Sequence, residues 1–152
     1  MHAGLGTRLR RLLDQLDADV ARAGVELGLV DYRPRFSPVV RALVADGPLS
    51  IRELAATVGV THSAASQTVA QMERADLVTL RAGPDARQRI VRLTPKTRRM
   101  LPAIEAEWTA TAAAMSTLDE ELPYPLTGVV EAVFQALERR PFHDRILDEL
   151  NH

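Results

Sequence analysis

The sequence predicts a mostly α-helical fold that contains one small β-hairpin. Apolar residues recur at spacings of three and four over most of the chain, which is the period of amphipathic helices. Between residues 78 and 93 the period changes to two, on either side of the turn sequence Gly83-Pro84-Asp85. The 152 residues suffice to bury a core without disulfides, and the chain contains no cysteine.

Start and stop signals delimit the expected helices. The first helix starts at Leu5 and ends near Gly28, and the second lies between Ser37-Pro38 and Asp46-Gly47-Pro48. A long helix follows Thr94-Pro95. The last helix lies between Pro123-Tyr124-Pro125 and Pro141, and a short tail follows it. We expect the Ser37 side chain to cap the second helix, and that of Thr94 to cap the long one.

Two short helices between residues 50 and 74 are the best-marked elements. Ser50 and Glu53 form a capping box at the start of the first, and Gly59 occupies the position of a C-cap. Thr61 can cap the second helix, whose expected buried face comprises Ala65, Thr68, Val69 and Met72. Two helices joined by such a turn form a helix-turn-helix, and with the hairpin that follows they predict a winged helix-turn-helix.

The charge is unevenly distributed although the net charge is only −1. Residues 46–99 carry nine basic and five acidic side chains, whereas residues 100–152 carry three basic and ten acidic ones. The basic part of the chain is therefore the predicted winged helix, which favours contact with nucleic acid through this region.

The outward face of the helix over residues 62–74 is polar. A helical wheel places Ser63, Gln67 and Arg74 opposite the apolar face, with Ser66 beside them. Gln67 can bond an adenine edge in a major groove, and Ser63 or Ser66 can reach bases or phosphate. Thr61 and the first amides of the helix suit a phosphate. The alternative is a solvated helix face.

Arg87 and Arg89 lie beside the turn of the hairpin, where arginine suits a narrow minor groove. Asp85 fits a surface that meets phosphate only if it holds the Arg87 side chain or the turn. The alternative is a solvated, charged hairpin.

The helices on either side of the winged helix carry apolar stripes that one small core does not require. We interpret residues 1–36 and 95–152 as dimerisation helices around a DNA-binding region at residues 37–94, all in one compact unit. In this interpretation the same stripes from two subunits interdigitate. Extra packing within one chain is the alternative.

The run from Leu49 to Arg99 resembles the winged helix of the MarR (multiple antibiotic resistance regulator) family. The matching segments are Leu49-Ser50-Ile51-Arg52-Glu53-Leu54-Ala55, Gly59-Val60-Thr61, Glu73-Arg74-Ala75-Asp76-Leu77-Val78, Asp85-Ala86-Arg87 and Val91-Arg92-Leu93-Thr94. The flanking helices fall where that family has its dimerisation domain, and the resemblance is weakest after Leu118.

The resemblance implies a homodimer that binds a pseudo-palindromic operator in double-stranded DNA and usually represses transcription. It also implies a small, frequently aromatic or phenolic, ligand that often releases the DNA. Ser63, Ser66 and Gln67 match the base-contacting part of the family's recognition helix, and Asp85 and Arg87 match its Asp-x-Arg wing motif.

Three positions depart from the family pattern. Gln67 stands where arginine is common, which puts the base preference in doubt. Asp76 and Thr97 stand where glycine is common, which suggests altered local turns within the same fold.

Other functions find little support in the sequence. The histidines, His2, His62, His143 and His152, are scattered, so no metal or other cofactor is expected. Asp119-Glu120-Glu121 is interpreted as a solvated helix end rather than as catalytic carboxylates, and no phosphate-binding glycine loop or nucleophile elbow is present, so we do not expect an enzyme. No signal peptide or membrane segment is recognisable, which predicts a cytoplasmic protein.

Two questions stay open at this point. A winged helix that binds an acidic protein partner is the alternative to a DNA-binding one, although such a surface would expose apolar anchors on the second helix. Trp108, Tyr32 and His62 are candidates to approach a ligand cleft, but Trp108 lies on an apolar stripe and the ligand site stays unassigned.

Overall fold

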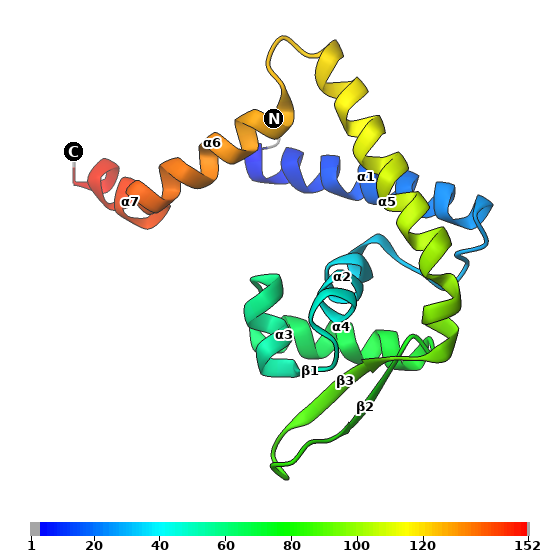
Figure 1. Cartoon of the computed structure of the whole chain (residues 1–152). Helices are drawn as coiled ribbons and strands as arrows, with labels where there is room; N and C mark the ends of the chain where they lie inside the picture. Colours follow the sequence, from blue (N-terminus) through cyan, green and yellow to red (C-terminus); the bar gives the residue numbers. More distant parts are fainter. Residues whose placement is uncertain (1–3, 152) are drawn as a thin grey trace. The chain divides into compact units, whose positions relative to one another are not determined.

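A computed structural model describes residues 4–151; His2 and His152 lie outside the described residues. The elements (Figure 1) are α1 (Leu5–Glu26), the 3₁₀ turn η1 (Pro34–Phe36), α2 (Ser37–Asp46), β1 (Leu49–Ser50), α3 (Ile51–Val58), α4 (His62–Arg74), β2 (Val78–Ala82), β3 (Arg89–Leu93), α5 (Pro95–Glu121), α6 (Leu126–Arg139) and α7 (Phe142–Leu150). They form two compact units, unit 1 (Met1–Trp108) and unit 2 (Thr109–His152).

Unit 1 contains the winged helix that the sequence predicts. Helices α2, α3 and α4 pack together with a three-stranded antiparallel sheet of order β1-β3-β2. The core includes Val40 and Leu43 of α2, Leu54 of α3, Val69 and Met72 of α4, Leu77, Val78 of β2, Val91 of β3 and Ile104 of α5. The predicted buried face of α4 is confirmed, with Ala65, Val69 and Met72 buried and Thr68 half-buried.

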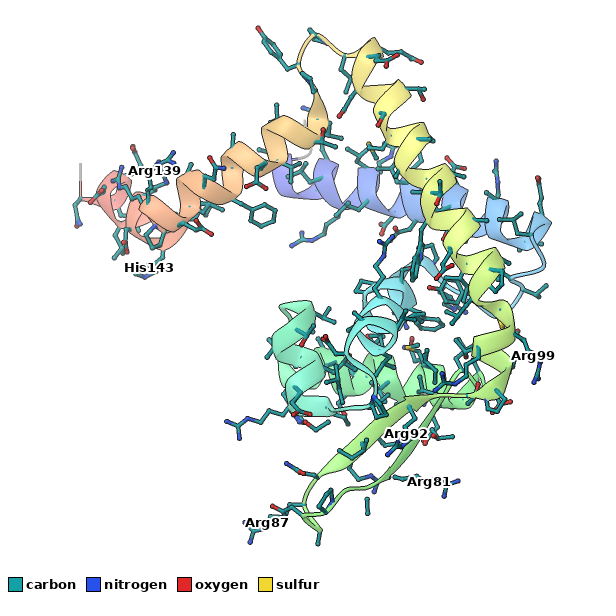
Figure 2. All side chains as sticks on the ribbon, in the orientation of Figure 1. Arg81, Arg87, Arg92, Arg99, Arg139 and His143 are labelled. Atoms are coloured by element: carbon teal, nitrogen blue, oxygen red, sulfur yellow. The ribbon has the colours of Figure 1, made fainter. Side chains whose placement is uncertain are left out.

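The predicted hairpin is confirmed, and its register places apolar side chains on one face. Val78 pairs with Leu93 and Leu80 pairs with Val91, so these four side chains face the core. Beyond the core the hairpin extends away from the helices of unit 1 (Figure 1), and arginines project from it (Figure 2). β1 was not predicted, because two residues are too few to show a period.

The helix-turn-helix begins as the capping signals predict. The Ser50 hydroxyl accepts a hydrogen bond from the Glu53 amide at 3.1 Å, and the Glu53 carboxylate accepts one from the Ser50 amide at 2.8 Å. The bond from the Ser50 amide holds the pKa of the Glu53 carboxyl below its ordinary value. Gly59 adopts the left-handed conformation at φ 78°, and Thr61 caps α4 by accepting from the Ala64 amide at 3.1 Å.

The prediction that the Ser37 side chain caps α2 is wrong. The turn η1 runs directly into α2, so Ser37 already has helical backbone angles and makes no capping bond. Its hydroxyl instead meets the Tyr32 hydroxyl at 2.9 Å and accepts from Trp108 Nε1 at 2.9 Å. Burial raises the pKa of the Tyr32 hydroxyl. Ser37 therefore connects the α1–α2 loop to α5.

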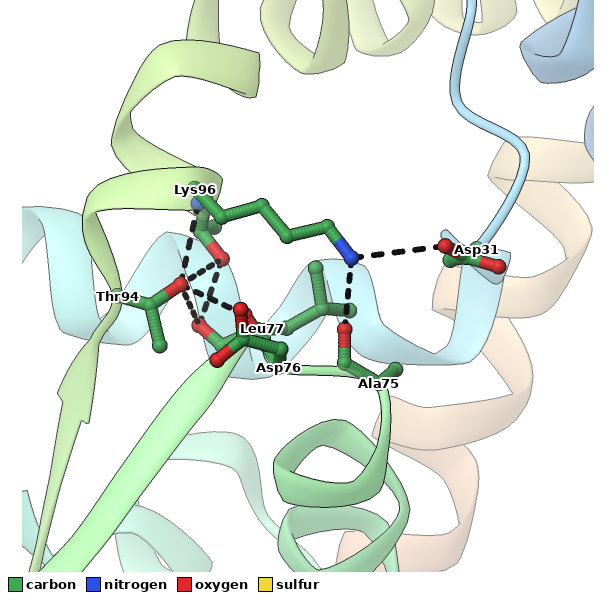
Figure 3. Close-up of polar contacts among 7 residues, drawn as sticks. Asp31, Ala75, Asp76, Leu77, Thr94 and Lys96 are labelled. Carbon is green, nitrogen blue, oxygen red and sulfur yellow. Dashed lines mark hydrogen bonds and ion pairs between the residues drawn. The ribbon is translucent and has the colours of Figure 1, made fainter.

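The end of α4 is hydrogen-bonded to the first turn of α5 (Figure 3). The Thr94 hydroxyl donates to the Asp76 carbonyl at 2.7 Å, and the Thr97 hydroxyl donates to the Leu77 carbonyl at 2.6 Å. Lys96 Nζ donates to the Ala75 carbonyl at 2.9 Å. Thr94 also caps α5 as predicted, by accepting from the Thr97 amide at 3.2 Å.

Asp76 and Thr97, which stand where glycine is common in the MarR family, both lie at this junction. Asp76 adopts φ 57°, in the left-handed region that favours glycine, so the turn keeps a glycine-like backbone with an aspartate in place. Thr97 is fully buried, and its hydroxyl contributes to the junction.

Unit 2 comprises the end of α5 together with α6 and α7. Asp119 caps α6, because its carboxylate accepts from the Thr127 hydroxyl and, at 2.7 Å, from the Leu126 amide. The Thr127 bond lowers the pKa of Asp119. No described residue of α6 or α7 is buried. Within residues 4–151, no helix has the length and apolar character needed to span a membrane.

Substitutions of Asp76 test the left-handed turn. A Cβ at positive φ costs about 1–2 kcal/mol, so Asp76→Gly should be more stable than Asp76→Ala by about 1 kcal/mol in urea unfolding. The matched control is the same pair at Glu73, inside α4, where glycine should be the less stable by about 1 kcal/mol. Finding the same order at both positions would contradict the assignment.

Candidate nucleic-acid interface

The exposed face of α4 is polar and free of acidic side chains over most of its length. Ser63 and Gln67 are exposed and Ser66 is half-buried. The helix has no acidic residue before Glu73. At 1.5 Å per residue its 13 residues extend about 20 Å, which suits a helix that lies in a major groove. The structure thus presents the predicted base-contacting residues on one accessible surface.

The N-terminus of α4, which Thr61 caps, is exposed to solvent. The Thr61 side chain satisfies the Ala64 amide, while Thr61, His62 and Ser63 are all exposed. The first turn therefore combines exposed hydroxyls with the positive end of the helix dipole, an arrangement that favours phosphate.

Arg74 lies in the last turn of α4, far along the helix from Thr61, and is exposed. Together with Arg33 and Arg35 it lines a cavity beside the α1–α2 loop. Sequence analysis predicted Arg74 as a DNA contact but did not predict this cavity.

The tip of the hairpin is shaped by Asp85. Its carboxylate accepts a hydrogen bond from the Arg87 amide at 3.1 Å, so of the two roles considered for Asp85, the structure shows that it holds the turn. The turn closes with Gly83 N–H donating to the Gln88 carbonyl at 2.8 Å. A Cβ on Gly83 would lie 3.0 Å from Ile90 Cγ1, which accounts for glycine there.

The arginines of the hairpin lie at distinct places. Arg87 is in the turn at the tip (Figure 2), and β3 begins two residues later, at Arg89, which pairs with Ala82. Alternation along β3 places Arg89 and Arg92 on opposite faces. Arg81 and Arg92 are also exposed, and sequence analysis did not include them although the same period-two pattern contains both.

Of the candidates for a ligand cleft, Tyr32 and Trp108 are brought together at Ser37. The Trp108 ring also carries the Arg41 guanidinium 4.0 Å from its centroid. Tyr32 also lines the cavity beside the α1–α2 loop, whereas Trp108 and Arg41 do not. His62 begins α4 and is exposed.

Fold and surface together define a winged helix-turn-helix with a polar second helix and an arginine-tipped wing. Comparison with known proteins agrees: residues 37–89 match the model of the MarR family, which confirms the resemblance. This segment is similar to the winged helix of that family. No curated protein sequence matches the chain.

Solved structures of transcriptional regulators share the fold over most of the chain. The regulator MosR of M. tuberculosis, solved in complex with DNA, is 24% identical, with 90% of this chain and 98% of that chain covered and a TM-score of 0.67. PcaV of Streptomyces coelicolor, solved with its natural ligand, is 23% identical, with 92% and 96% covered and a TM-score of 0.63. A mutant MarR of E. coli is 14% identical, with 90% and 98% covered and a TM-score of 0.53.

Substitution of Asp85 tests its role in the wing. Asp85→Ala removes the acceptor of the Arg87 amide, and a hydrogen bond of about 1 kcal/mol corresponds to about fivefold faster exchange of that amide with solvent. Hydrogen exchange followed by NMR measures this rate. Asp85→Asn keeps an acceptor oxygen and is the control. An unchanged rate in the alanine variant would show that Asp85 does not hold the turn.

Proposed function

We propose that this protein is a sequence-specific DNA-binding transcriptional regulator. It acts as a homodimeric repressor on a pseudo-palindromic operator and is released by a small ligand. The main support for the proposal is that unit 1 combines a polar face on α4, which has few acidic residues, with a hairpin that has arginine at its tip. Both belong to a segment that matches the MarR family. The DNA-bound MosR structure adds support by fold.

In this proposal α4 is the recognition helix. Gln67 has an amide that donates and accepts, so it suits the major-groove edge of adenine, and Ser63 and Ser66 bond bases or phosphate nearby. Thr61 and the first amides of α4 bind a phosphate, which fixes the register of the helix. Arg74 contacts the DNA backbone near the C-terminal end of α4.

The wing supplies the second contact. Arg87 at the tip and Arg89 at the start of β3 carry exposed guanidinium groups, which a narrow minor groove attracts through its negative potential. Asp85 is part of this contact because it shapes the turn that carries Arg87. A near-neutral protein thereby gains a local positive surface, and a dimer presents it twice.

Exposed apolar stripes support a homodimer. Large apolar side chains are exposed along α1, α6 and α7, a set that includes Leu5, Leu9, Leu13, Val129, Val133, Phe134, Phe142, Ile146 and Leu150. Exposed apolar side chains that recur along a helix mark interaction sites, and a two-fold interface would cover them. We therefore propose residues 1–36 and 95–152 as the dimerisation region around the DNA-binding region at 37–94.

The ligand is proposed as a small aromatic or phenolic effector that acts in the cytoplasm, where the operator lies. PcaV, of the same fold, was solved with its natural ligand. A ligand that prefers the DNA-free state of the protein lowers its affinity for the operator by linkage.

Gel-shift assays with genomic fragments at moderate salt test the proposal. A subset of fragments should shift at low protein concentration while the rest do not. Retardation of all fragments alike, or of none, would instead favour a winged helix that binds an acidic protein partner.

Gln67→Ala and Arg87→Ala separate base contacts from general anchoring. Gln67→Ala should lose about 1–3 kcal/mol on the preferred site and relax the preference at one base pair of each half-site. Arg87→Ala should weaken binding to all variants of the site alike. Equal losses on specific and random DNA for Gln67→Ala would show that Gln67 does not determine sequence preference.

Substitution of Phe134 tests the dimer. Phe134 on α6 is 61% exposed, and its ring gains about 2–3 kcal/mol when an interface buries it. Because a two-fold interface holds two copies, Phe134→Glu should convert a dimer at micromolar concentration into a monomer in sedimentation velocity. Gln135→Glu, one position along, should leave the dimer intact. A monomeric unsubstituted protein would contradict the assignment.

A further inference from the structure

The hairpin of β2 and β3 has two faces of different chemistry. The side chains that pack against the helices of the winged helix are Val78, Leu80, Val91 and Leu93. Because side chains alternate along a strand, the opposite face carries Thr79, Arg81, Ile90 and Arg92. These four residues form the outer face of the hairpin.

Arg81 and Arg92 give the outer face a positive charge. Both are exposed (Figure 2), and neither forms an ion pair with another residue in the range 4–151. Arg81 pairs with Ile90 and Arg92 pairs with Thr79, so the two arginines are diagonal neighbours whose Cβ atoms lie about 7 Å apart. Two like charges at this separation repel each other, and an anion bound between them would remove the repulsion.

The composition of the outer face suits a nucleic acid better than a protein partner. Ile90 is its one large apolar side chain, and it is half-buried against Gly83. The face therefore lacks the exposed aromatic or aliphatic anchor that a protein partner would bury. Guanidinium and hydroxyl groups, in contrast, are the groups that contact phosphate oxygens of DNA.

The outer face is turned away from α4, because the other face of the same strands packs on the core that α4 shares. In the proposed function α4 lies in a major groove and Arg87, at the tip, meets the adjacent minor groove. A duplex that passes α4 and then the tip continues on the side to which the outer face is turned. Arg89 lies on the opposite face from Arg92 and stays on the side of the operator.

We propose that the outer face of the hairpin, through Arg81 and Arg92, binds phosphates of the duplex DNA that flanks each half-site of the operator. This inference rests on the proposed function. The contact does not depend on base sequence, because guanidinium groups that reach phosphates bind the charge of the backbone. Two arginines in each of two protomers give four such contacts, which extend the bound DNA at both ends of the operator.

Fluorescence anisotropy with two duplexes tests the proposal. Both contain the same selected binding site, but the short duplex ends at the outer edges of the half-sites, whereas the long one continues on each side for about 10 base pairs, one helical turn. The full chain should bind the long duplex about tenfold more tightly at low salt. Since each phosphate contact adds about −0.9 to the slope of log affinity against log salt, the long duplex should give a slope steeper by about 2–4.

A double variant locates the contact on the outer face. Arg81→Gln, Arg92→Gln should bind the short duplex within about twofold of the unsubstituted protein and the long duplex about tenfold more weakly than that protein, with thermal unfolding unchanged. The matched control is Arg22→Gln, Arg139→Gln, which removes the same charge from exposed positions on α1 and α6. The control should keep the full preference for the long duplex.

Several results would overturn the proposal. Equal losses on both duplexes would place Arg81 and Arg92 within the operator contact, and an equal loss in the control would reduce the effect to net charge. Equal binding of both duplexes by the unsubstituted protein, or a preference for the long duplex that survives in the Arg81→Gln, Arg92→Gln variant, would favour an acidic protein partner for this face. These results would leave the proposed function intact, whereas a chain that binds neither duplex would contradict both.

Discussion

The hydrogen bonds at the end of α4 determine the geometry on which both proposals depend. The carbonyl of Ala75, the C-cap of α4, and those of Asp76 and Leu77 in the turn that follows accept from the side chains of residues 94–97. Because the donors all belong to one short segment after β3, the end of α4 and the base of the hairpin are held by the same bonds.

The features that the sequence predicts correctly depend on residues close together in the chain. The capping box of Ser50 and Glu53, the cap at Thr61 and the buried face of α4 each need only a few consecutive residues and a helical period. The family motifs are local in the same way. Most of the winged helix and its candidate contact residues could therefore be assigned without coordinates.

The features that the sequence missed depend on residues far apart. Ser37 has the sequence signature of a cap, but its hydroxyl bonds Trp108, 71 positions away. The partner of β1 is the distant strand β3, and two residues show no period. The cavity draws its arginines from the α1–α2 loop and from α4, and no spacing rule connects those segments. Asp85 was predicted only in part. Its bond to the Arg87 amide is local, but the sequence allowed it to hold either the Arg87 side chain or the turn, and only the structure distinguishes the two.

Charge and exposed apolar side chains are unevenly distributed along the chain. The positive charge lies in the winged helix, whereas α6 and α7 combine acidic residues with exposed apolar side chains, a composition that suits contact with another protein chain rather than with DNA. A cavity whose lining includes Arg33, Arg35 and Arg74 lies beside the C-terminal end of α4.

The central claim, that two copies of this winged helix bind one operator, is tested most directly by a hydroxyl-radical footprint of the full chain on a genomic fragment selected for binding. Two recognition helices related by a two-fold axis must enter the same face of the duplex about one helical turn apart. The account predicts protected segments on the two strands related by two-fold symmetry, with half-site centres about 10 base pairs apart. A single asymmetric protected segment, or uniform protection along the fragment, would contradict it.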